Sequence, residues 1–382
     1  MVGDPMSRLL FDVTRLLESG LHTGIQRVVR CLLAASRRRY SARGYQVLAV
    51  SFSGVHWQAF DELAPHPFQG LGQHAQGQGA AIEPGDGDVL LMFDASWYAD
   101  PWPAVDAALA RGARLVGMVH DLLPLEHPEW FREGLEQRFT DHLNHMIDRA
   151  EQMFVPTQAV RERLMARLSA RGTLLTVNVL AHGGDFCSLT STAEQIESYQ
   201  TVLPAPATPD DPLYLVLGTL EPRKNHGLVL DAFEALWSQG KSPRLLFVGN
   251  VGWQVDRLIE RLQNHPLLGD RLFHAANLSD PALLWLIRNS TALVYVPWDE
   301  GFGLPVLEAA MQGCPVIASD IPVLREAGRQ WPTFIEPGSL NDLIQAIDTF
   351  PQREPVQAFH RTWDDVAQQL VGIFLNMPSR AQ

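Results

Sequence analysis

The sequence predicts an α/β fold built as two domains with parallel sheets. Three observations indicate it: short apolar runs alternate with helical patterns, the alternation recurs in both halves, and a proline-rich stretch separates the halves. Of the 382 residues, 46% are hydrophobic and 19% are charged. This is enough apolar material for two cores, in a chain longer than one domain usually needs.

The predicted strands are short apolar runs bounded by turn residues. In the first half they are Leu9–Val13, Val47–Phe52, Val89–Phe93, Leu115–Val119 and Met153–Val155. In the second half they are Leu213–Leu217, Leu245–Val248, Leu293–Val296 and Val316–Ala318. The helices predicted between the later strands are Gly227–Trp237, Pro281–Arg288 and Leu304–Gln312, the last one stopped by Gly313.

The domain boundary follows from four prolines within Thr201–Pro212. Proline at that density opposes both a helix and a central strand. We therefore expect a first domain over residues 1–200, a linker over 201–212 and a second domain over 213–355. The segment 356–382 contains one more predicted helix, near Val356–Asn376, which is a candidate for packing back on the first domain.

The formal net charge of −13 argues against binding of nucleic acid or another polyanion by the chain as a whole. The N-terminus has no apolar signal core, and no apolar run approaches the ~20 residues of a membrane span. We expect a cytoplasmic protein. Residues 1–43 differ from the rest, since eight arginines leave them an excess of five positive charges. Either the predicted helix Ile25–Arg39 packs in the core with its arginines solvated, or it contacts anionic lipid at the inner face of the cytoplasmic membrane.

The segment Val296–Glu308 runs from a strand, through a glycine-containing turn, into a helix. Open α/β sheets bind ligands at the carboxyl ends of their strands. Glycines let a ligand approach the backbone, and the helix N-terminus offers free N–H groups to an anion or a hydroxyl. Glu300 stands before the turn and Glu308 follows on the helix, with seven residues between them. A lone Glu at a helix start is usually solvated, but the Glu-Gly-Phe-Gly-Leu-Pro setting of residues 300–305 favours a functional site.

Three other candidates also follow predicted strands. Arg223 and Lys224 come after Leu213–Leu217, where paired cations would meet phosphates. The alternative is an ordinary pair of surface cations, which the position after a strand disfavours. His120 follows Leu115–Val119 and Gly24 lies in a turn after Leu9–Val13. A lone His is most often structural, so only its placement makes His120 a candidate.

The stretch from Glu300 to Gly328 resembles the Glu-x7-Glu signature of retaining GT-B glycosyltransferases, in particular that of the large bacterial family four, which includes mannosyltransferases of surface polysaccharide synthesis. The segments Gly218–His226, Thr23–Arg27 and His120–Asp121 agree with the resemblance in order. It implies two Rossmann-like domains facing each other across a cleft, with the donor bound mainly to the second. The chain departs from the family pattern at Ala181–Asp185, Trp298 and Asp299.

The same resemblance implies roles for individual residues. Arg223 and Lys224 would hold the donor diphosphate, and Glu308 the ribose hydroxyls. Glu300 and the Gly301–Gly303 backbone would hold the transferred sugar, with Phe302 and Leu304 completing that donor-binding turn. Gly24 would lie near donor and acceptor, and His120 on the acceptor side. These are the predicted catalytic residues Glu300, Arg223, Lys224 and His120, and the predicted donor-binding residues Gly24, Gly301, Phe302, Gly303, Leu304 and Glu308.

The predicted activity is transfer of a hexose, with mannose favoured, from a nucleotide-diphosphate sugar to a saccharide acceptor. The resemblance favours GDP-mannose as donor, a lipid-linked acceptor and a place in surface polysaccharide synthesis such as that of lipopolysaccharide. A phosphorylase or sugar-nucleotide epimerase on the same architecture is one alternative, and a non-catalytic donor-binding subunit of a glycosyltransferase complex is another. A dinucleotide oxidoreductase is disfavoured because Val306 stands where a third glycine belongs.

We expect no metal and no cofactor. Asp86-Gly-Asp88 matches the Asp-x-Asp motif of metal-dependent glycosyltransferases. It precedes the predicted strand Val89–Phe93, however, and so lies at the wrong end to meet a ligand. The neighbouring Pro84, Gly85 and Gly87 favour a turn instead.

Overall fold

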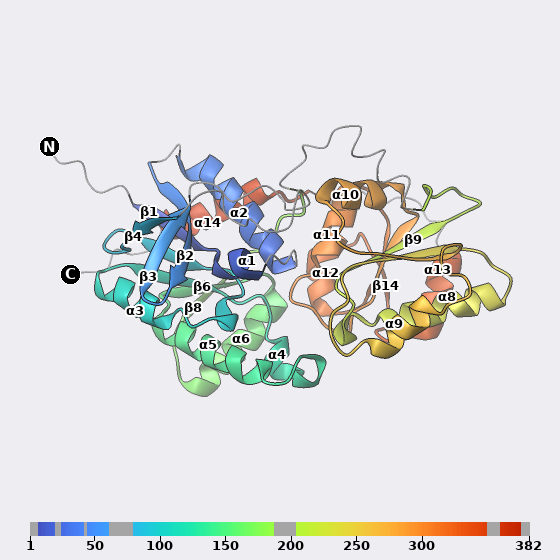
Figure 1. Ribbon diagram of the computed structural model, residues 1–382, viewed down its shortest axis with the longest axis horizontal. Helices are drawn as coiled ribbons and strands as arrows, with labels where there is room; N and C mark the ends of the chain where they lie inside the picture. The colour runs from blue at the N-terminus through green and yellow to red at the C-terminus, as the bar shows by residue number, and fades with distance from the viewer. Residues whose placement is uncertain are drawn as a thin grey trace. The chain divides into compact units, whose positions relative to one another are not determined.

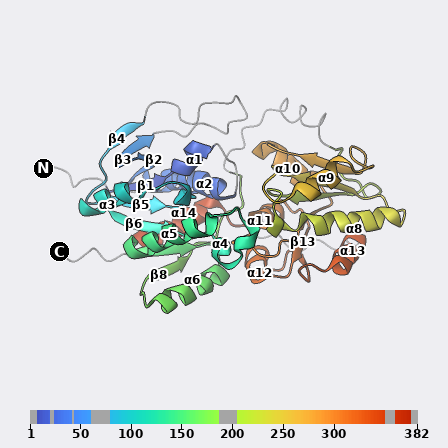
Figure 2. The same cartoon turned by 60° about the horizontal axis from the view of Figure 1, so that its bottom comes forward.

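The computed structural model describes residues 7–19, 24–41, 44–60, 79–186, 204–349 and 360–375. They form two compact units, each an α/β domain (Figures 1 and 2). The first unit comprises residues 1–128, 133–183 and 361–382, and the second comprises residues 129–132 and 184–360.

The first domain contains an eight-stranded sheet in the order β4-β3-β2-β1-β5-β6-β7-β8. Strands β3 and β4 pair antiparallel at one edge, and the other strands are parallel. The strands are β1 Arg8–Asp12, β2 Gln46–Ser53, β3 His56–Phe60, β4 Ala80–Ile82, β5 Val89–Met92, β6 Arg114–Met118, β7 Gln152–Val155 and β8 Thr176–Val179. The helices are α1 Thr14–Ser19, α2 Gly24–Tyr40, α3 Trp102–Ala110, α4 Leu123–Glu126, α5 Leu135–Arg149, α6 Gln158–Arg171 and α14 Trp363–Leu375.

The second domain contains a six-stranded parallel sheet in the order β11-β10-β9-β12-β13-β14. The strands are β9 Leu213–Leu217, β10 Arg244–Val248, β11 Leu272–Ala275, β12 Ala292–Tyr295, β13 Val316–Ser319 and β14 Thr333–Ile335. The helices are α8 His226–Ser238, α9 Asp256–Gln263, α10 Asp280–Asn289, α11 Leu304–Met311, α12 Pro322–Gly328 and α13 Leu340–Thr349. Three short 3-10 turns complete the described elements of the chain: η2 Ser96–Tyr98 in the first domain, η3 Pro128–Trp130, and η4 Pro222–Lys224 in the second domain.

Helices cover both faces of the second sheet because its central strands β9, β10, β12 and β13 are buried at every residue. Alternate residues of β9 enter different cores: Tyr214 and Val216 pack with α8 and α13, whereas Leu213, Leu215 and Leu217 pack with α10, α11 and α12. Side chains of a strand alternate between the two faces of a sheet, so each face needs its own layer of helices. The second domain is therefore a three-layer, doubly wound unit with its loops at the carboxyl edge of the sheet.

The C-terminal helix α14 packs on α2 and belongs to the first domain (Figure 1). Arg38 and Arg39 of α2 lie 2.6 and 3.7 Å from the carboxylate of Asp364. Arg37 donates to the carbonyl oxygens of Val47 and Phe60, at 3.3 and 3.1 Å. The apolar face of α2 is buried within the domain, and Arg37, Arg38 and Arg39 have polar partners there.

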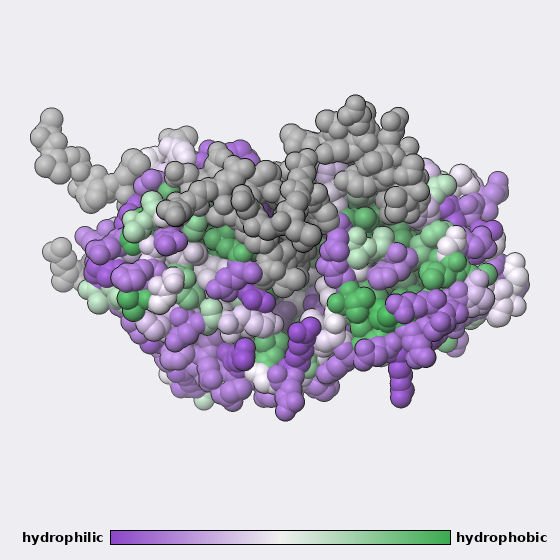
Figure 3. Space-filling model, in the orientation of Figure 1, coloured by the Kyte–Doolittle hydropathy of each residue, from purple (hydrophilic) through white to green (hydrophobic). Residues whose placement is uncertain are grey.

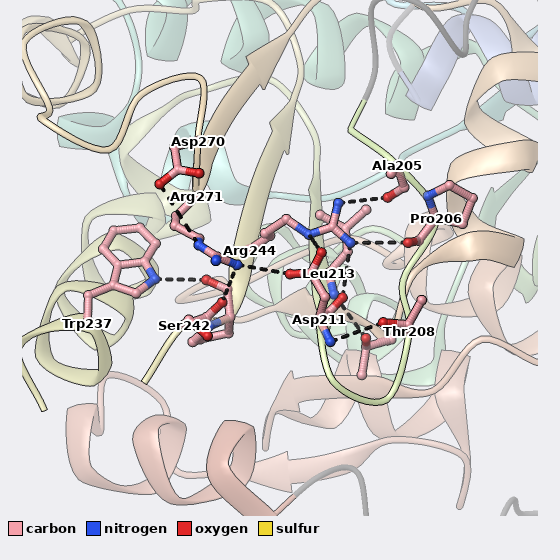
Figure 4. Close-up of polar contacts among 12 residues, drawn as sticks. Ala205, Pro206, Thr208, Asp211, Leu213, Trp237, Ser242, Arg244, Asp270 and Arg271 are labelled. Atoms are coloured by element: carbon pink, nitrogen blue, oxygen red, sulfur yellow. Dashed lines mark hydrogen bonds and ion pairs between the residues drawn. The ribbon is translucent and has the colours of Figure 1, made fainter. Parts of the chain in front are cut away.

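The proline-rich segment differs from the expected linker. Its described part, residues 204–212, is held by the second domain, where Arg244 donates to the carbonyl oxygens of Ala205 at 2.8 Å and Asp211 at 3.0 Å (Figure 4). Arg271 also donates to the Asp211 carboxylate at 2.9 Å. Prolines prevent a helix here but leave carbonyl oxygens free to accept hydrogen bonds. Residues 184–186 also belong to the second unit, and residues 187–203, which include the start of the expected linker, lie outside the described residues.

Much of the surface of both domains carries hydrophilic side chains (Figure 3). Hydrophobic side chains gather on one part of the second domain in that view. Among the described helices, none combines the length and the hydropathy that a transmembrane segment requires.

Candidate active site

The predicted charged residues meet where the strand order of the second sheet reverses. Strand β9 lies between β10 and β12, and the chain leaves β9 and β12 in opposite directions along the sheet. Such a switch point opens a crevice at the carboxyl ends of the two strands. The loop after β9 carries Arg223 and Lys224 on η4, and β12 leads into Glu300. A backbone bond from Trp298 N to the Arg223 carbonyl, 2.9 Å long, ties the two loops together.

Five side chains form a connected group here, which we call the Glu300 cluster: Glu221, Arg223, Lys224, Tyr295 and Glu300. Three of them converge on Oε1 of Glu300. Lys224 Nζ donates to it and forms an ion pair with it, Arg223 Nη1 lies 2.7 Å from it, and the Tyr295 hydroxyl donates to it at 2.8 Å. Lys224 Nζ also donates to the Tyr295 hydroxyl at 2.6 Å, and Arg223 Nη2 lies 2.8 Å from a Glu221 oxygen. Two carboxylates and two cations make the cluster neutral.

Burial and charge act in opposite directions on Glu300. Burial alone would raise the pKa of its carboxyl, but the charges of Arg223 and Lys224, with hydrogen bonds from Lys224 and Tyr295, outweigh burial and lower the pKa to about 2. Burial and the neighbouring Arg223 lower the pKa of Lys224 from its ordinary value. Burial and the Glu300 charge raise the pKa of Tyr295 well above its ordinary value. At neutral pH the carboxylate is ionised and the phenol keeps its proton.

The turn after Glu300 requires glycine. Gly303 has a φ of +88°, and a Cβ there would collide with the side chain of Leu324. Pro305 stands in the first turn of α11, where its missing N–H costs no hydrogen bond. Phe302 and Leu304 are buried beside the turn, and Glu308 lies on α11 with only 4% of its surface exposed. The turn therefore brings the N-terminus of α11 to the switch point together with the Glu300 cluster.

The two predicted residues of the first domain lie at the carboxyl edge of the first sheet. His120 follows β6 and its Nε2 lies 2.8 Å from the carbonyl oxygen of Phe93. Burial lowers the pKa of His120 to about 4, so the ring is neutral at neutral pH. The ring centroid of His182 lies 5.9 Å from that of His120 and 5.8 Å from that of Trp363. Gly24 is exposed at the start of α2.

Two buried carboxylates share this edge with His120. Asp12, at the end of β1, accepts from Thr14 N at 3.0 Å and from the hydroxyl of Ser96. Asp94, after β5, accepts from Leu16 N at 2.7 Å and from Gln26 Nε2 at 3.2 Å. Burial raises the pKa of both, and the charge of Asp12 contributes to raising that of Asp94 to about 6. Their oxygens are used to hold the turns after β1 and β5.

The structure brings together Arg223, Lys224, Glu300 and the glycine turn, as predicted from sequence, and adds Tyr295 and Glu221 to them. Sequence reasoning missed Tyr295 because it ends an apolar strand and reads as a core residue. The only available signal was its phenol, a polar atom at a strand end next to a predicted site. Glu221 stands two residues before Arg223, a spacing at which a counter-ion could have been considered.

The Asp-x-Asp motif of residues 86–88 lies in the turn before β5. Asp88 accepts from Arg8 Nε at 2.7 Å and from the N–H of Gly85 at 2.8 Å, and Gly87 has a φ of +81°. These contacts give Asp88 a structural role in that turn. Over the described residues, no group of three or more His, Cys, Asp and Glu side chains is arranged to hold a metal ion.

Comparisons with known proteins agree on one family. Residues 204–360 match the family model described as glycosyl transferases group 1. The serotype-specific mannosyltransferase WbdA of Escherichia coli is 34% identical over 352 residues, covering 89% of this chain. The match covers 41% of WbdA, so the chain spans about two-fifths of the length of that relative. The O-antigen chain mannosyltransferase B of Escherichia coli is 23% identical, with 69% of this chain and 71% of that protein covered.

Solved structures share the fold. Sucrose-phosphate synthase from Thermosynechococcus elongatus matches with a TM-score of 0.64 and 17% identity, covering 97% of this chain and 98% of that one. Anabaena HepE, solved in complex with UDP and glucose, matches with a TM-score of 0.61 and 15% identity, covering 98% and 100%. The predicted GT-B class is thus confirmed, and residues 204–360 match the group 1 family of glycosyl transferases.

Proposed function

We propose that this chain transfers a hexose from a nucleoside-diphosphate sugar to a saccharide acceptor with retention of anomeric configuration. The observation that carries the proposal is the placement of Arg223, Lys224 and Glu300 at the switch point beside the N-terminus of α11. A diphosphate leaving group gains negative charge as its bond to the sugar breaks. Two cations and a helix N-terminus stabilise such charge, and electrostatic stabilisation of this kind is often the largest catalytic contribution.

Each residue has a role in the proposal. Arg223 and Lys224 hold the diphosphate, Glu308 holds the nucleotide ribose, and Glu300 with the backbone of Gly301–Gly303 holds the hexose. Phe302 and Leu304 fix that turn by their burial. His120 and Gly24 belong to the acceptor side, where the neutral ring of His120 would accept or donate one hydrogen bond. No general base is assigned, because the departing phosphate can itself accept the proton of the attacking hydroxyl.

Mannose, donated by GDP-mannose, is the hexose that we propose. Support comes from WbdA and the O-antigen chain mannosyltransferase B, which are both mannosyltransferases. The test is calorimetry of the purified chain with GDP and with UDP in excess EDTA. We expect GDP to bind more tightly, and tight binding of UDP with none of GDP would overturn the choice of donor.

The acceptor that we propose is a lipid-linked saccharide, met at the inner face of the cytoplasmic membrane. One relative is an O-antigen chain mannosyltransferase, which supports an acceptor of this type. Arg38 and Arg39 remain 55% and 41% exposed while pairing with Asp364, and so can still face an anionic surface. Flotation with anionic and neutral liposomes at low and high salt tests the contact: we expect anion-dependent binding that salt removes. Equal binding to both kinds of liposome, or to neither, would contradict it.

Turnover separates this proposal from a non-catalytic donor-binding subunit. Incubation with GDP-mannose and a mannose-terminated oligosaccharide should give GDP and an acceptor extended by one α-linked residue, detected by mass spectrometry and NMR. A chain that binds GDP but forms no extended product with such acceptors would favour the binding subunit. With inorganic phosphate added, release of mannose 1-phosphate from the oligosaccharide would favour a phosphorylase, and conversion of the donor without an acceptor would favour an epimerase.

A further inference from the structure

The cations of the candidate donor site are already occupied by a carboxylate of the protein itself. Lys224 Nζ and Arg223 Nη1 both meet Oε1 of Glu300, and the Tyr295 hydroxyl donates to the same atom. Only 6% of the surface of Glu300 is exposed, so its carboxylate is satisfied by these protein groups and hardly by water. Glu300 therefore stands where the anionic oxygen of a ligand would be expected to bind.

A diphosphate cannot simply be added to this arrangement. The cluster is neutral, with Glu221 and Glu300 against Arg223 and Lys224. A bound diphosphate would place further negative charges beside two buried carboxylates, and like charges in a poorly solvated site repel strongly. Lys224 and Arg223 can bind the diphosphate only if their ion pairs with Glu300 are weakened or broken.

The cluster contains the two groups that such a change needs. Tyr295 keeps its proton and can remain a donor to Glu300 at 2.8 Å when Lys224 leaves. Glu221 lies 2.8 Å from Nη2 of Arg223, the nitrogen that does not face Glu300, and can keep the guanidinium in place. Lys224 has a flexible stem that runs beside Gly218, where the absence of a Cβ leaves room for it to move.

We propose that Glu300 is an internal surrogate for the donor diphosphate, and that donor binding exchanges it for phosphate on Lys224 and Arg223. Tyr295 and Glu221 are then positioning residues: the first retains Glu300 after the exchange, and the second retains Arg223. The exchange frees the Glu300 carboxylate for the hydroxyls of the hexose only when a diphosphate is bound. This inference rests on the proposed function, because it takes a diphosphate as the ligand of the cluster.

The exchange predicts affinity changes of opposite sign for two variants. Inorganic pyrophosphate is the probe, titrated by calorimetry in excess EDTA. Glu300→Gln removes the competing carboxylate, so pyrophosphate should bind at least about tenfold more tightly than to the wild type, although sugar transfer falls. Tyr295→Phe removes the donor that retains Glu300, so Lys224 stays on the carboxylate and pyrophosphate should bind about threefold more weakly.

A merely structural role for these residues would weaken binding in both variants. Tyr214→Phe is the matched control, because the Tyr214 hydroxyl donates to the carbonyl of Ile347 at 2.9 Å within the same domain and lies outside the cluster. It should leave pyrophosphate affinity unchanged. Glu300→Gln binding pyrophosphate no more tightly than the wild type would overturn the exchange. If that variant does not fold, unchanged or tighter binding by Tyr295→Phe would overturn it equally.

The same titrations distinguish the inference from the function beneath it. If the wild type binds GDP and transfers sugar while the variants show none of these shifts, the exchange is wrong and the transferase stands. If neither pyrophosphate nor any nucleoside diphosphate binds to the wild type or to Glu300→Gln, the cluster is not a diphosphate site and both proposals fall.

Discussion

The carboxyl edges of the two sheets gather polar residues for different purposes. In the second domain Arg223, Lys224 and Glu300 form a buried group of full charges, in which both cations pair with one carboxylate. In the first domain the carboxylates of Asp12 and Asp94 accept hydrogen bonds from backbone and side-chain donors of the neighbouring turns. Burial keeps the ring of His120 neutral. The same α/β architecture thus supplies buried ion pairs at one edge and hydrogen bonds to the neighbouring turns at the other.

This difference assigns the two edges to different parts of the proposed reaction. Charge development on a diphosphate needs cations, which Arg223 and Lys224 supply at the edge of the second sheet. An acceptor saccharide is uncharged and needs orientation by hydrogen-bond donors and acceptors, which suits the first domain. Variants of the second edge should therefore change donor binding or the chemical step, and variants of the first should mainly change stability or acceptor affinity.

The largest effect is expected from Lys224→Ala. Its charge matters most as the bond between phosphate and sugar breaks, so kcat should fall by at least about 10²-fold while the KM for acceptor changes little. Steady-state kinetics with varied donor and acceptor measure both. Lys241→Ala, which removes a cation paired with Asp348 at the surface of the same domain, is the control and should leave the kinetics intact. Wild-type kinetics in Lys224→Ala would remove the phosphate role.

A smaller effect is expected from Glu308→Ala. Glu308 is buried on α11, and a contact with the ribose changes little between ground state and transition state. The KM for donor should rise about tenfold with kcat within about twofold of the wild type. A fall in kcat at saturating donor, with KM unchanged, would move Glu308 from donor binding into the chemical step.

The smallest effect concerns the first domain and appears in stability. Neither ring nitrogen of His142 has a hydrogen-bond partner among the described residues, and burial lowers its pKa to about 4. The unfolded chain takes up this proton below its ordinary pKa of about 6.5 and the folded chain does not, so stability is lost as pH falls from 6.5 to 4. The drop in the free energy of unfolding from pH 7.5 to pH 5 should be about 2 kcal/mol smaller in His142→Phe than in the wild type.

Denaturant titrations at the two pH values measure that difference. The raised pKa of Asp94 acts with the opposite sign below pH 6, but it is present in both proteins and cancels in the comparison. Leu143→Met, on the same helix, is the control: it should lower stability equally at both pH values. An identical pH dependence in His142→Phe and the wild type would show that the ring is hydrated or protonated in the folded state.

Much of the fold could be predicted from sequence because most strands are apolar runs. Val89–Met92 and Leu213–Leu217 are buried at every residue and were predicted to within a residue. The missed strands include His56–Phe60 and Thr176–Val179, which are half exposed or polar, so their residues carry no comparable signal. The prolines of residues 204–212 predicted irregular backbone, but nothing local indicates that Arg244 attaches it to the second domain.

The candidate site was predictable where function depends on residues that follow strands, as with Lys224 and Glu300. It was not predictable where function depends on a contact between distant segments. Tyr295 meets Lys224 across 71 positions of sequence, and only the pairing of β9 with β12 brings them together. The neutrality of the cluster, on which the proposed exchange depends, is likewise a property of the folded arrangement.

In the proposed reaction Lys224 and Arg223 neutralise the donor diphosphate without a metal ion. This is tested by the rate of sugar transfer by purified protein in excess EDTA, compared with the same protein in magnesium and in manganese. We expect nearly equal rates in the three conditions, because two cations and the N-terminus of α11 are sufficient counter-charge. Complete loss of transfer in EDTA, restored by magnesium or manganese, would contradict it.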